Sequence, residues 1–134
     1  MSILIDTNVF LWAAGITGNL SPEVRALLEE PGGPIFLSAA SAWEISIKWA
    51  KKRLILPDKP GAFIDKFVSA ASFTKLSVNF ADACAVAEFK LVNKDPFDRL
   101  ILAQARNHGL RLLTSDVGLQ HPDVDVILCK RKQL

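Results

Sequence analysis

Short apolar runs alternate with longer segments of mixed polarity along the chain. Each apolar run stops abruptly at polar residues, as Ile3–Ile5 does at Asp6, and this is typical of a strand buried in a sheet. The longer segments carry apolar residues at helical spacing. These patterns predict strands over residues 3–5, 35–37, 76–78, 110–114 and 124–128, and helices over 21–30, 62–71, 81–92 and 95–108, with a further helix containing 43–48.

Cap residues mark several of the predicted helix boundaries. Asp95 stands before a proline, which combines a side-chain cap with a residue suited to the first helical position. Either Ser38 or Ser41 caps the helix that contains residues 43–48. Gly109 suits a left-handed cap at the end of the helix that begins at Asp95.

The alternation of short apolar strands with helices predicts an α/β fold. We expect a layered sandwich, with a mostly parallel central sheet flanked by helices. A chain of 134 residues fits one domain, and we expect a single domain over residues 1–134. In such a fold ligands bind outside the carboxyl ends of the strands, so chemistry is sought there.

Composition narrows the class of protein. Half of the residues are hydrophobic and the mean hydropathy is +0.25, which predicts an ordered core rather than disorder. No apolar run approaches the roughly 20 residues that span a bilayer, and the first residues lack the features of a signal peptide. Cys84 and Cys129 are too few for a disulfide framework or a cysteine-rich zinc site. The expected setting is cytoplasmic, without a membrane.

The charge balance adds little by itself. The net charge is only +2 and the pI is near 8.6, which permits nucleic-acid binding without arguing for it. The basic residues gather in two places, at Lys48, Lys51, Lys52 and Arg53 and again over residues 130–132. A solvated helix end and a loose tail are the simplest interpretations of these two clusters.

Four acidic residues occupy positions that can meet at one edge of the predicted sheet. Asp6 follows the first strand directly, and Asp116 follows the fourth after one serine. Glu44 lies in the helix after the second strand, and Asp98 lies in the first turn of its own helix. Because right-handed crossovers start these helices at the same edge, the four carboxylates can converge.

Each acid also has a purely structural interpretation. Asp6 suits a turn with the two polar residues that follow it, and Asp116 suits a cap. Glu44 can pair with Lys48 at the i+4 position of a helix. Asp98 can be the capping-box partner of the acid that precedes its helix.

The apolar surroundings of Asp6 and Glu44 favour a catalytic or metal-binding role over a purely structural one. Grouped carboxylates repel one another unless they are protonated, paired with bases or bound to a cation, and oxygen ligands favour Mg²⁺ or Mn²⁺ over zinc. His108 and His121 form no obvious metal-ligand pair and are more typical of ordinary surface or core histidines. Without a P-loop or a serine-nucleophile elbow, metal-assisted phosphodiester hydrolysis is the leading enzyme hypothesis.

Four stretches of the chain form a recognisable series in this order: Leu4–Asn8, Leu37–Lys48, Asp95–Ala105 and Leu112–Asp116. One such motif is weak, but four at suitable spacing cover nearly the whole chain. Together they resemble PIN-domain ribonucleases, and specifically the VapC-type toxins of bacterial toxin–antitoxin systems. The fold that this resemblance implies is a PIN-like three-layer sandwich.

The resemblance implies an endoribonuclease that depends on Mg²⁺ or Mn²⁺ and leaves a 5′-phosphate and a 3′-hydroxyl. Asp6, Asp98 and Asp116 would hold the metal most directly, and Glu44 would add a ligand or position the attacking water. Thr7, Asn8 and Ser115 would give polar support, while Arg99 and Lys48 are candidate RNA contacts.

The family further implies a homodimer and an inhibitory VapB-like antitoxin whose C-terminal peptide binds near the acidic pocket. Trp12, Trp43 and Trp49 could supply apolar surface for such contacts, although core or dimer-interface positions are commoner for tryptophan. Two departures stand out: Asn8 and residues 92–94 replace histidines that many relatives carry. The second leaves in doubt any histidine-assisted contact to RNA or partner.

Two alternatives compete with a nuclease. A receiver-type signalling domain shares the architecture, but it needs adjacent acids after its first strand, where this chain has Thr7 and Asn8. A catalytically idle PIN-like module that binds RNA or protein would be expected to lack part of the acidic set, which is complete here.

Overall fold

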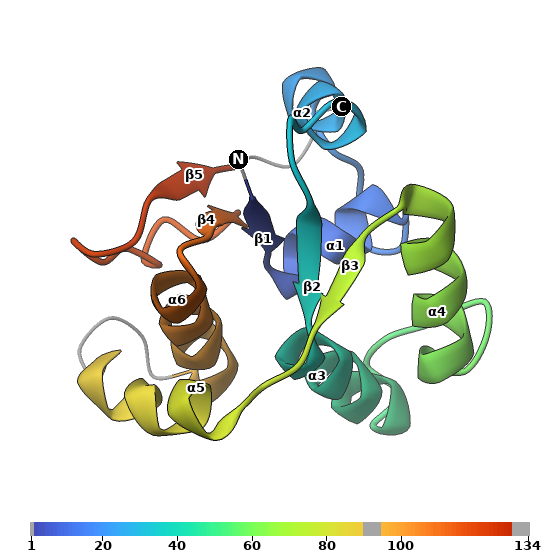
Figure 1. Ribbon diagram of the computed structural model, residues 1–134. Helices are drawn as coiled ribbons and strands as arrows, with labels where there is room; N and C mark the ends of the chain where they lie inside the picture. Colours follow the sequence, from blue (N-terminus) through green and yellow to red (C-terminus); the bar gives the residue numbers. More distant parts are fainter. Residues whose placement is uncertain (1, 90–94, 130–134) are drawn as a thin grey trace.

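The computed structural model describes residues 2–89 and 95–129. Five parallel strands form one sheet in the order β3-β2-β1-β4-β5, with β1 at its centre (Figure 1). The strands are β1 (Ile3–Ile5), β2 (Ile35–Ser38), β3 (Thr74–Leu76), β4 (Arg111–Thr114) and β5 (Val126–Leu128). The helices are α1 (Thr7–Ala13), α2 (Pro22–Glu29), α3 (Ala39–Ala50), α4 (Pro60–Ala71), α5 (Phe80–Ala85), the 3₁₀ helix η1 (Val86–Phe89) and α6 (Pro96–His108).

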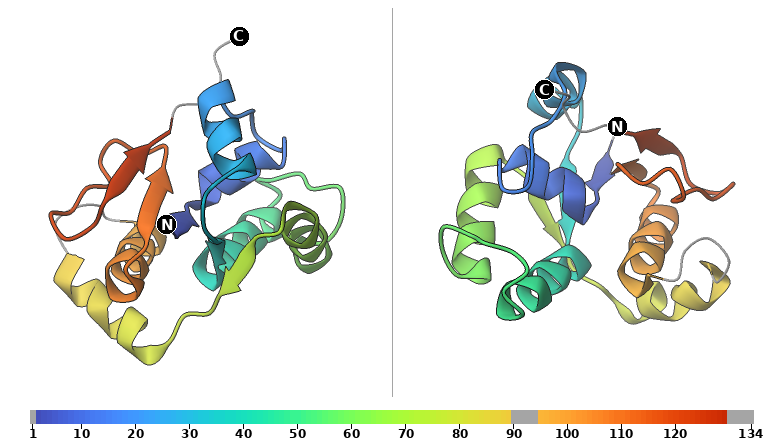
Figure 2. Two further views of the ribbon diagram at one scale, coloured as in Figure 1. Left: turned by 45° about the horizontal axis from the view of Figure 1, so that its top comes forward. Right: turned by 180° about the vertical axis from the view of Figure 1, so that it is seen from behind.

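Helices cover both faces of the sheet, and β1 shows why. Ile3 and Ile5 point into one apolar cluster, together with side chains of α1 and α4, while Leu4 points into a second cluster with α5 and α6. Alternate residues of a strand face opposite sides, so a wholly apolar strand needs a helical layer on each side. The views in Figure 2 show the resulting three layers, which confirm the predicted α/β sandwich.

The carboxyl ends of the strands open toward α3 and the start of α6. Figure 1 shows α3 beneath the end of β2, and contacts join α3 to both α1 and α6. Ser38, rather than Ser41, caps α3, and Gly109 ends α6 with the predicted left-handed conformation at φ 64°. The starts of α1 and α3, which follow β1 and β2 almost directly, therefore lie at this edge.

Helix α1 was not among the predicted elements. The sequence after β1 suggested a turn at Asp6, but that carboxylate accepts the hydrogen bond that begins a helix over Thr7–Ala13. A turn and a helix N-cap use the same local side-chain bond, so the first residues cannot separate them. Tertiary packing decides, because Phe10 is completely buried against the first apolar cluster.

The segment around β3 was predicted two residues too late. The strand pairs with β2 over Thr74–Leu76, not residues 76–78. At Ser77 the backbone carbonyl accepts a hydrogen bond from the Gln104 side chain at 3.1 Å, and Asn79 caps the next helix. The strand has therefore ended by residue 77.

Other boundaries differ by smaller amounts. The predicted helix over 81–92 is α5 followed by η1, and its residues 90–92 lie outside the described part of the chain, as does the basic segment 130–132. The last strand is shorter than predicted, and α4 begins at Pro60, because a proline suits the first helical position. Within the described residues, no helix has the length and apolar character needed to cross a membrane.

Candidate acidic active site

Asp6 is fixed where β1 passes into α1. Its Oδ1 accepts the backbone N–H of Val9 at 2.8 Å, which caps the helix. Its Oδ2 accepts the hydroxyl of Thr114 and, at 3.3 Å, the backbone N–H of Ser115. Burial raises the pKa of Asp6, these hydrogen bonds oppose the rise, and the negative charge of Glu44 adds to it. Asp6 is therefore both a helix cap and a buried carboxylate at the sheet edge.

Thr114, the last residue of β4, links two of the predicted acids. Its hydroxyl donates to Asp6 and accepts the backbone N–H of Asp116 at 3.1 Å. The Asp116 carboxylate in turn accepts the backbone N–H of Gly118 at 2.8 Å. A Cβ at Gly118 would lie 3.3 Å from that oxygen, so a larger residue would crowd the turn that holds Asp116.

Glu44 lies in the second turn of α3 and is buried despite its charge. Lys48 follows at the i+4 position, and its Nζ lies 2.7 Å from Glu44 Oε2, so the predicted helical ion pair is present. The Thr7 hydroxyl donates to Ser41 at 2.9 Å, which ties the start of α1 to the first turn of α3. Both helices are thus held against each other beside Glu44.

Asp98 is the third residue of α6, behind the predicted Asp95 cap. Asp95 accepts the backbone N–H two residues on at 2.9 Å, as a cap does. Burial and nearby negative charges together raise the pKa of Asp98 to about 7. Burial is the largest cause, followed in order of size by the charges of Asp95, Glu44, Asp116 and Asp6. Asp98 therefore lies within reach of the charges of the other three acids of the predicted quartet, at the carboxyl edge of the sheet.

Gln104 supports this edge from inside the core. It is completely buried on α6, and its Oε1 accepts the hydroxyl of Ser38, the residue that caps α3. Its Nε2 donates to the carbonyl of Ser77 at 3.1 Å and to Asp82 at 3.3 Å. Gln104 thus connects α6, which carries Asp98, to the beginning of α3, which carries Glu44.

Asp82 is the charged member of this buried network. Its carboxylate accepts hydrogen bonds from Asn107 and His108, each at 3.1 Å, besides the one from Gln104. Burial by itself would raise the pKa of Asp82, but the hydrogen bonds from His108, Asn107, the Asn79 backbone and Gln104 outweigh it and lower the pKa. His108 is accordingly a structural partner, as the sequence suggested.

The predicted supporting residues fare differently. Thr7 is buried and bonded to Ser41, whereas Ser115 supports Asp6 through its backbone N–H. Asn8 is exposed on α1, and Arg99 is half-buried beside Asp98 in the first turn of α6.

Sequence reasoning missed Thr114 and Gln104. Both are completely buried polar residues inside stretches that the sequence had already singled out: Thr114 ends the strand before Ser115, and Gln104 lies inside the apolar stretch that follows Asp98. An uncharged polar residue within a core-forming run is the signal that could have found them, because such a group needs a buried partner.

The donor set suits a hard divalent cation by its chemistry. Four carboxylates supply only oxygen atoms, which Mg²⁺ and Mn²⁺ prefer, and their mutual repulsion would be relieved by a bound cation. Among residues 2–89 and 95–129, however, no three His, Cys, Asp or Glu side chains already stand close enough to hold a metal ion. The chemistry therefore fits, and coordination would require these side chains to draw together.

The fold is an all-parallel α/β sandwich with acidic residues at the carboxyl edge of its sheet. Comparison with known proteins identifies the family to which it belongs. The PIN domain family model matches residues 3–125. The chain therefore belongs to the PIN domain family. A search of curated protein sequences finds no match.

Solved structures share the fold across nearly the whole chain. A chain from VapBC2 of Rickettsia felis, bound to a DNA fragment from its promoter, is 15% identical with a TM-score of 0.68, covering 96% of this chain and 98% of that one. A chain from DNA-bound VapBC of Salmonella typhimurium is 16% identical with a TM-score of 0.69, covering 95% of this chain and 97% of that one. A chain from FitAcB of Neisseria gonorrhoeae is 22% identical with a TM-score of 0.63, covering 92% of this chain and 95% of that one. At such identities the likeness concerns the fold.

Proposed function

We propose that the protein is a metal-dependent endoribonuclease, a VapC-like toxin that hydrolyses RNA phosphodiester bonds. The observation that carries the proposal is that Asp98 lies within reach of the charges of Asp6, Glu44 and Asp116, which come from three other segments of the chain. Membership of the PIN domain family supports it, since PIN domains are typically nucleases.

Asp6, Asp98 and Asp116 would hold Mg²⁺ or Mn²⁺, with Glu44 as a further ligand or as the group that positions the attacking water. A bound divalent ion supplies Lewis-acid activation of water and neutralises charge at the phosphate. Thr114 keeps Asp6 and the backbone of Asp116 in a fixed relation. The ion pair with Lys48, at 2.7 Å, orients the Glu44 carboxylate.

The partners follow from the same reasoning. The structures with this fold from Rickettsia felis and Salmonella typhimurium are VapBC complexes, and another is a toxin–antitoxin complex from Klebsiella pneumoniae. We therefore propose a VapB-like antitoxin as the inhibitory partner, RNA as the substrate and a homodimer as the assembly.

Cleavage of a structured RNA pool tests the nuclease proposal. We expect cleavage with Mg²⁺ or Mn²⁺ that EDTA abolishes, and a loss of at least about a hundredfold in Asp98→Asn. Asp58→Asn makes the same chemical change at an exposed position and should leave cleavage unchanged. Equal cleavage by wild type and Asp98→Asn would refute the proposed site.

A catalytically idle module that binds RNA or protein is the competing function. The observation that favours it is that no three acidic side chains of the described residues are already arranged around a metal position. Thermal unfolding separates the two. A metal site raises the unfolding midpoint with Mg²⁺ or Mn²⁺ in wild type and not in Asp98→Asn, whereas an idle module shows no such difference.

A further inference from the structure

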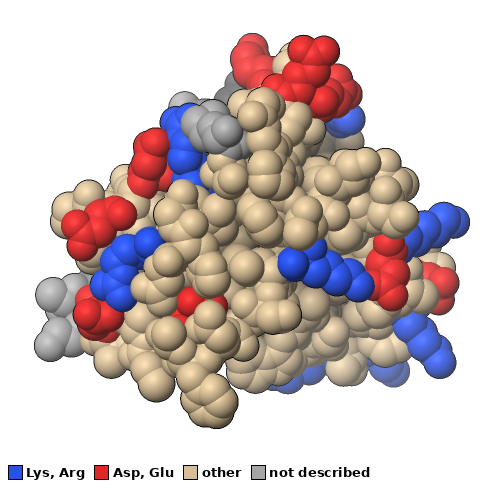
Figure 3. All heavy atoms as spheres, in the orientation of Figure 1, with Lys and Arg blue, Asp and Glu red and all other residues tan. Residues whose placement is uncertain are grey.

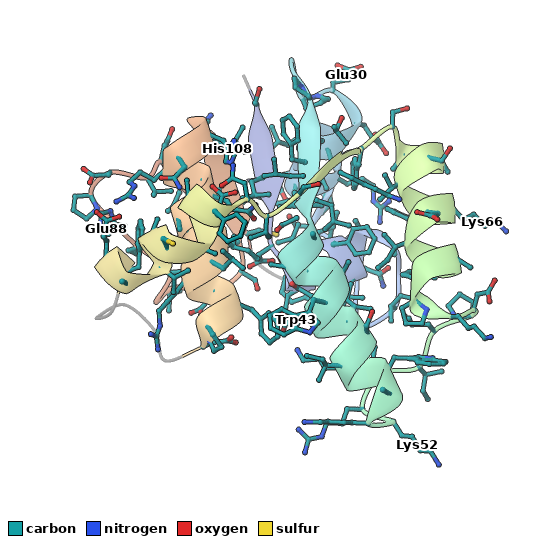
Figure 4. All side chains as sticks on the ribbon, turned by 60° about the horizontal axis from the view of Figure 1, so that its bottom comes forward. Glu30, Trp43, Lys52, Lys66, Glu88 and His108 are labelled. Carbon is teal, nitrogen blue, oxygen red and sulfur yellow. The ribbon has the colours of Figure 1, made fainter. Side chains whose placement is uncertain are left out.

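Two aromatic rings meet beside the acidic site. Trp43 immediately precedes Glu44 on α3, and Phe97 immediately precedes Asp98 on α6. Their ring centroids lie 4.9 Å apart with an interplanar angle of 71°, so one ring presents an edge to the other. Figure 4 shows Trp43 on the side of α3 that faces α6. The aromatic pair therefore bridges the two helices that carry candidate site residues.

Trp43 is not used to build the core. Its side chain is 59% exposed, whereas Ile45 on the same helix is completely buried and Trp12 packs against the first apolar cluster. A tryptophan that is open to solvent beside a functional edge is an unusual use of a large apolar side chain. The contact with Phe97 restricts the Trp43 ring while leaving most of its surface open.

Basic residues continue from the acidic site along α3. Lys48 lies one turn beyond Glu44, and Lys51 caps the C-terminal end of the helix. At i, i+4 and i+7 these three residues share one face, with Lys48 about 6 Å and Lys51 about 10 Å along the axis from Glu44. Lys52, at the far end of α3 in Figure 4, and Arg53 add exposed positive charge there.

The remaining surface offers no comparable feature on the face drawn in Figure 3. There, a group of negative side chains lies at the top, over α2, and elsewhere positive and negative side chains are interspersed with uncharged surface. The surface of α3 from Trp43 to Lys51 therefore differs from that face, because it combines an exposed aromatic ring, a candidate catalytic edge and a row of cations. Aromatic rings and cations in this combination are what single-stranded nucleic acid binds.

We propose that Trp43 stacks against an unpaired nucleobase of a single-stranded RNA segment, whose phosphate backbone runs from the acidic edge along Lys48 and Lys51. The inference rests on the proposed function, because a phosphate held near Glu44 and Asp98 brings the adjacent nucleotide next to Trp43. Stacking needs a base that is free of its own stack, so the surface selects unpaired RNA over duplex.

Binding of a short labelled oligoadenylate in EDTA tests the stacking contact without cleavage. Trp43→Ala should weaken binding by about 5- to 150-fold, and Trp43→Phe, which keeps an aromatic face, should recover most of it. Trp49→Ala is the matched control. Trp49 is also exposed on α3, at 38%, but six residues on it points to another side, and binding should change less than twofold. The same oligoadenylate annealed to its complement should bind wild type and Trp43→Ala equally.

The proposed contact between Lys51 and the phosphate backbone of the RNA is tested by a separate measurement. Lys51→Gln should weaken binding of every single-stranded sequence alike and lower the slope of log affinity against log salt by about 0.7. An unchanged slope would overturn the proposed path along α3. Equal oligoadenylate binding by wild type, Trp43→Ala and Trp49→Ala would overturn the stacking contact.

Two further outcomes separate this inference from the proposed nuclease. If Trp43→Ala dissociates a dimer in sedimentation and leaves RNA affinity unchanged, the ring belongs to a protein interface and the inference fails. Trp43-dependent binding without any metal-dependent cleavage supports the binding surface and refutes the nuclease. Metal-dependent cleavage whose KM is the same in wild type and Trp43→Ala refutes the surface and leaves the nuclease standing.

Discussion

Replacing Gln104 by methionine tests whether the buried network holds the site edge together. Methionine keeps the length and most of the volume of the side chain but removes its amide. The hydroxyl of Ser38, which is buried, then loses its acceptor, and Asp82 loses one of its donors. Asp82 keeps its bonds with Asn107 and His108. The carbonyl of Ser77 belongs to an exposed residue and can bind water instead.

The cost is therefore dominated by one unsatisfied buried hydroxyl and one lost bond to a charged group. A buried polar group without a partner costs about 1–3 kcal/mol, and a hydrogen bond to a charged group contributes about 1.5–3 kcal/mol at ideal geometry. The bond to Asp82 is long at 3.3 Å, so its share is at the low end. We expect a loss of about 2–4 kcal/mol in unfolding free energy, or about 6–12 °C in Tm at about 3 °C per kcal/mol.

Urea and thermal unfolding measure this loss, with Gln120→Met as the matched control. Gln120 is exposed, so the same substitution there should change stability by less than about 0.5 kcal/mol. In a double-mutant cycle, Gln104→Met combined with Ser38→Ala should cost at least about 1 kcal/mol less than the sum of the two single changes, because the orphaned hydroxyl is gone. Equal losses at positions 104 and 120, or strictly additive losses at 38 and 104, would refute the reasoning.

Two further predictions concern acid stability and the core. The pKa of Asp82 is lower in the folded chain than its unfolded value near 3.9, so the group contributes stability above about pH 4 that is lost as the pH falls below it. In urea unfolding measured at a series of pH values, Asp82→Asn should therefore reduce the loss of unfolding free energy below about pH 4. The same loss in wild type and Asp82→Asn would contradict the assignment. Phe10 is completely buried, edge-on to Phe63 and Phe67, so Phe10→Ala should cost about 3–5 kcal/mol in unfolding free energy. Phe80→Ala, at a side chain that is 91% exposed, should cost under about 0.5 kcal/mol, and similar losses for both would disprove the packing account.

Local signals predicted a good part of the fold. Helix α6 begins after Asp95, which is followed by a proline, and ends at Gly109 in the left-handed conformation, as predicted. These signals are readable because caps act over a few residues. The apolar runs at β1 and β2 were recognisable because a strand buried on both faces has no polar positions. Asp6 and Asp116 were recognisable as candidate site residues because they follow strands, Asp98 because it lies in the first turn of its helix, and Glu44 because of its apolar neighbours.

Contacts between distant residues explain what local signals missed. The hydroxyl of Thr114 reaches Asp6 across 108 positions, and Ser38 reaches Gln104 across 66. Asp6 and Asn79 act locally as helix caps, but the formation of α1 and the early end of β3 also depend on the burial of Phe10 and on the Gln104 bond to Ser77. Neither effect has a signature within a short window of sequence.

The sequence by itself determined the alternation of elements, the helix caps of α6 and which acids could form a site, because each depends on hydrophobic period or on residues a few positions apart. The tertiary structure alone decided that Asp6 caps a helix, that Asp98 lies within reach of the charges of the other three acids, and that Trp43 stands exposed beside Glu44. Burial and charge repulsion depend on distances in space, and the order of strands across the sheet brings those distances about.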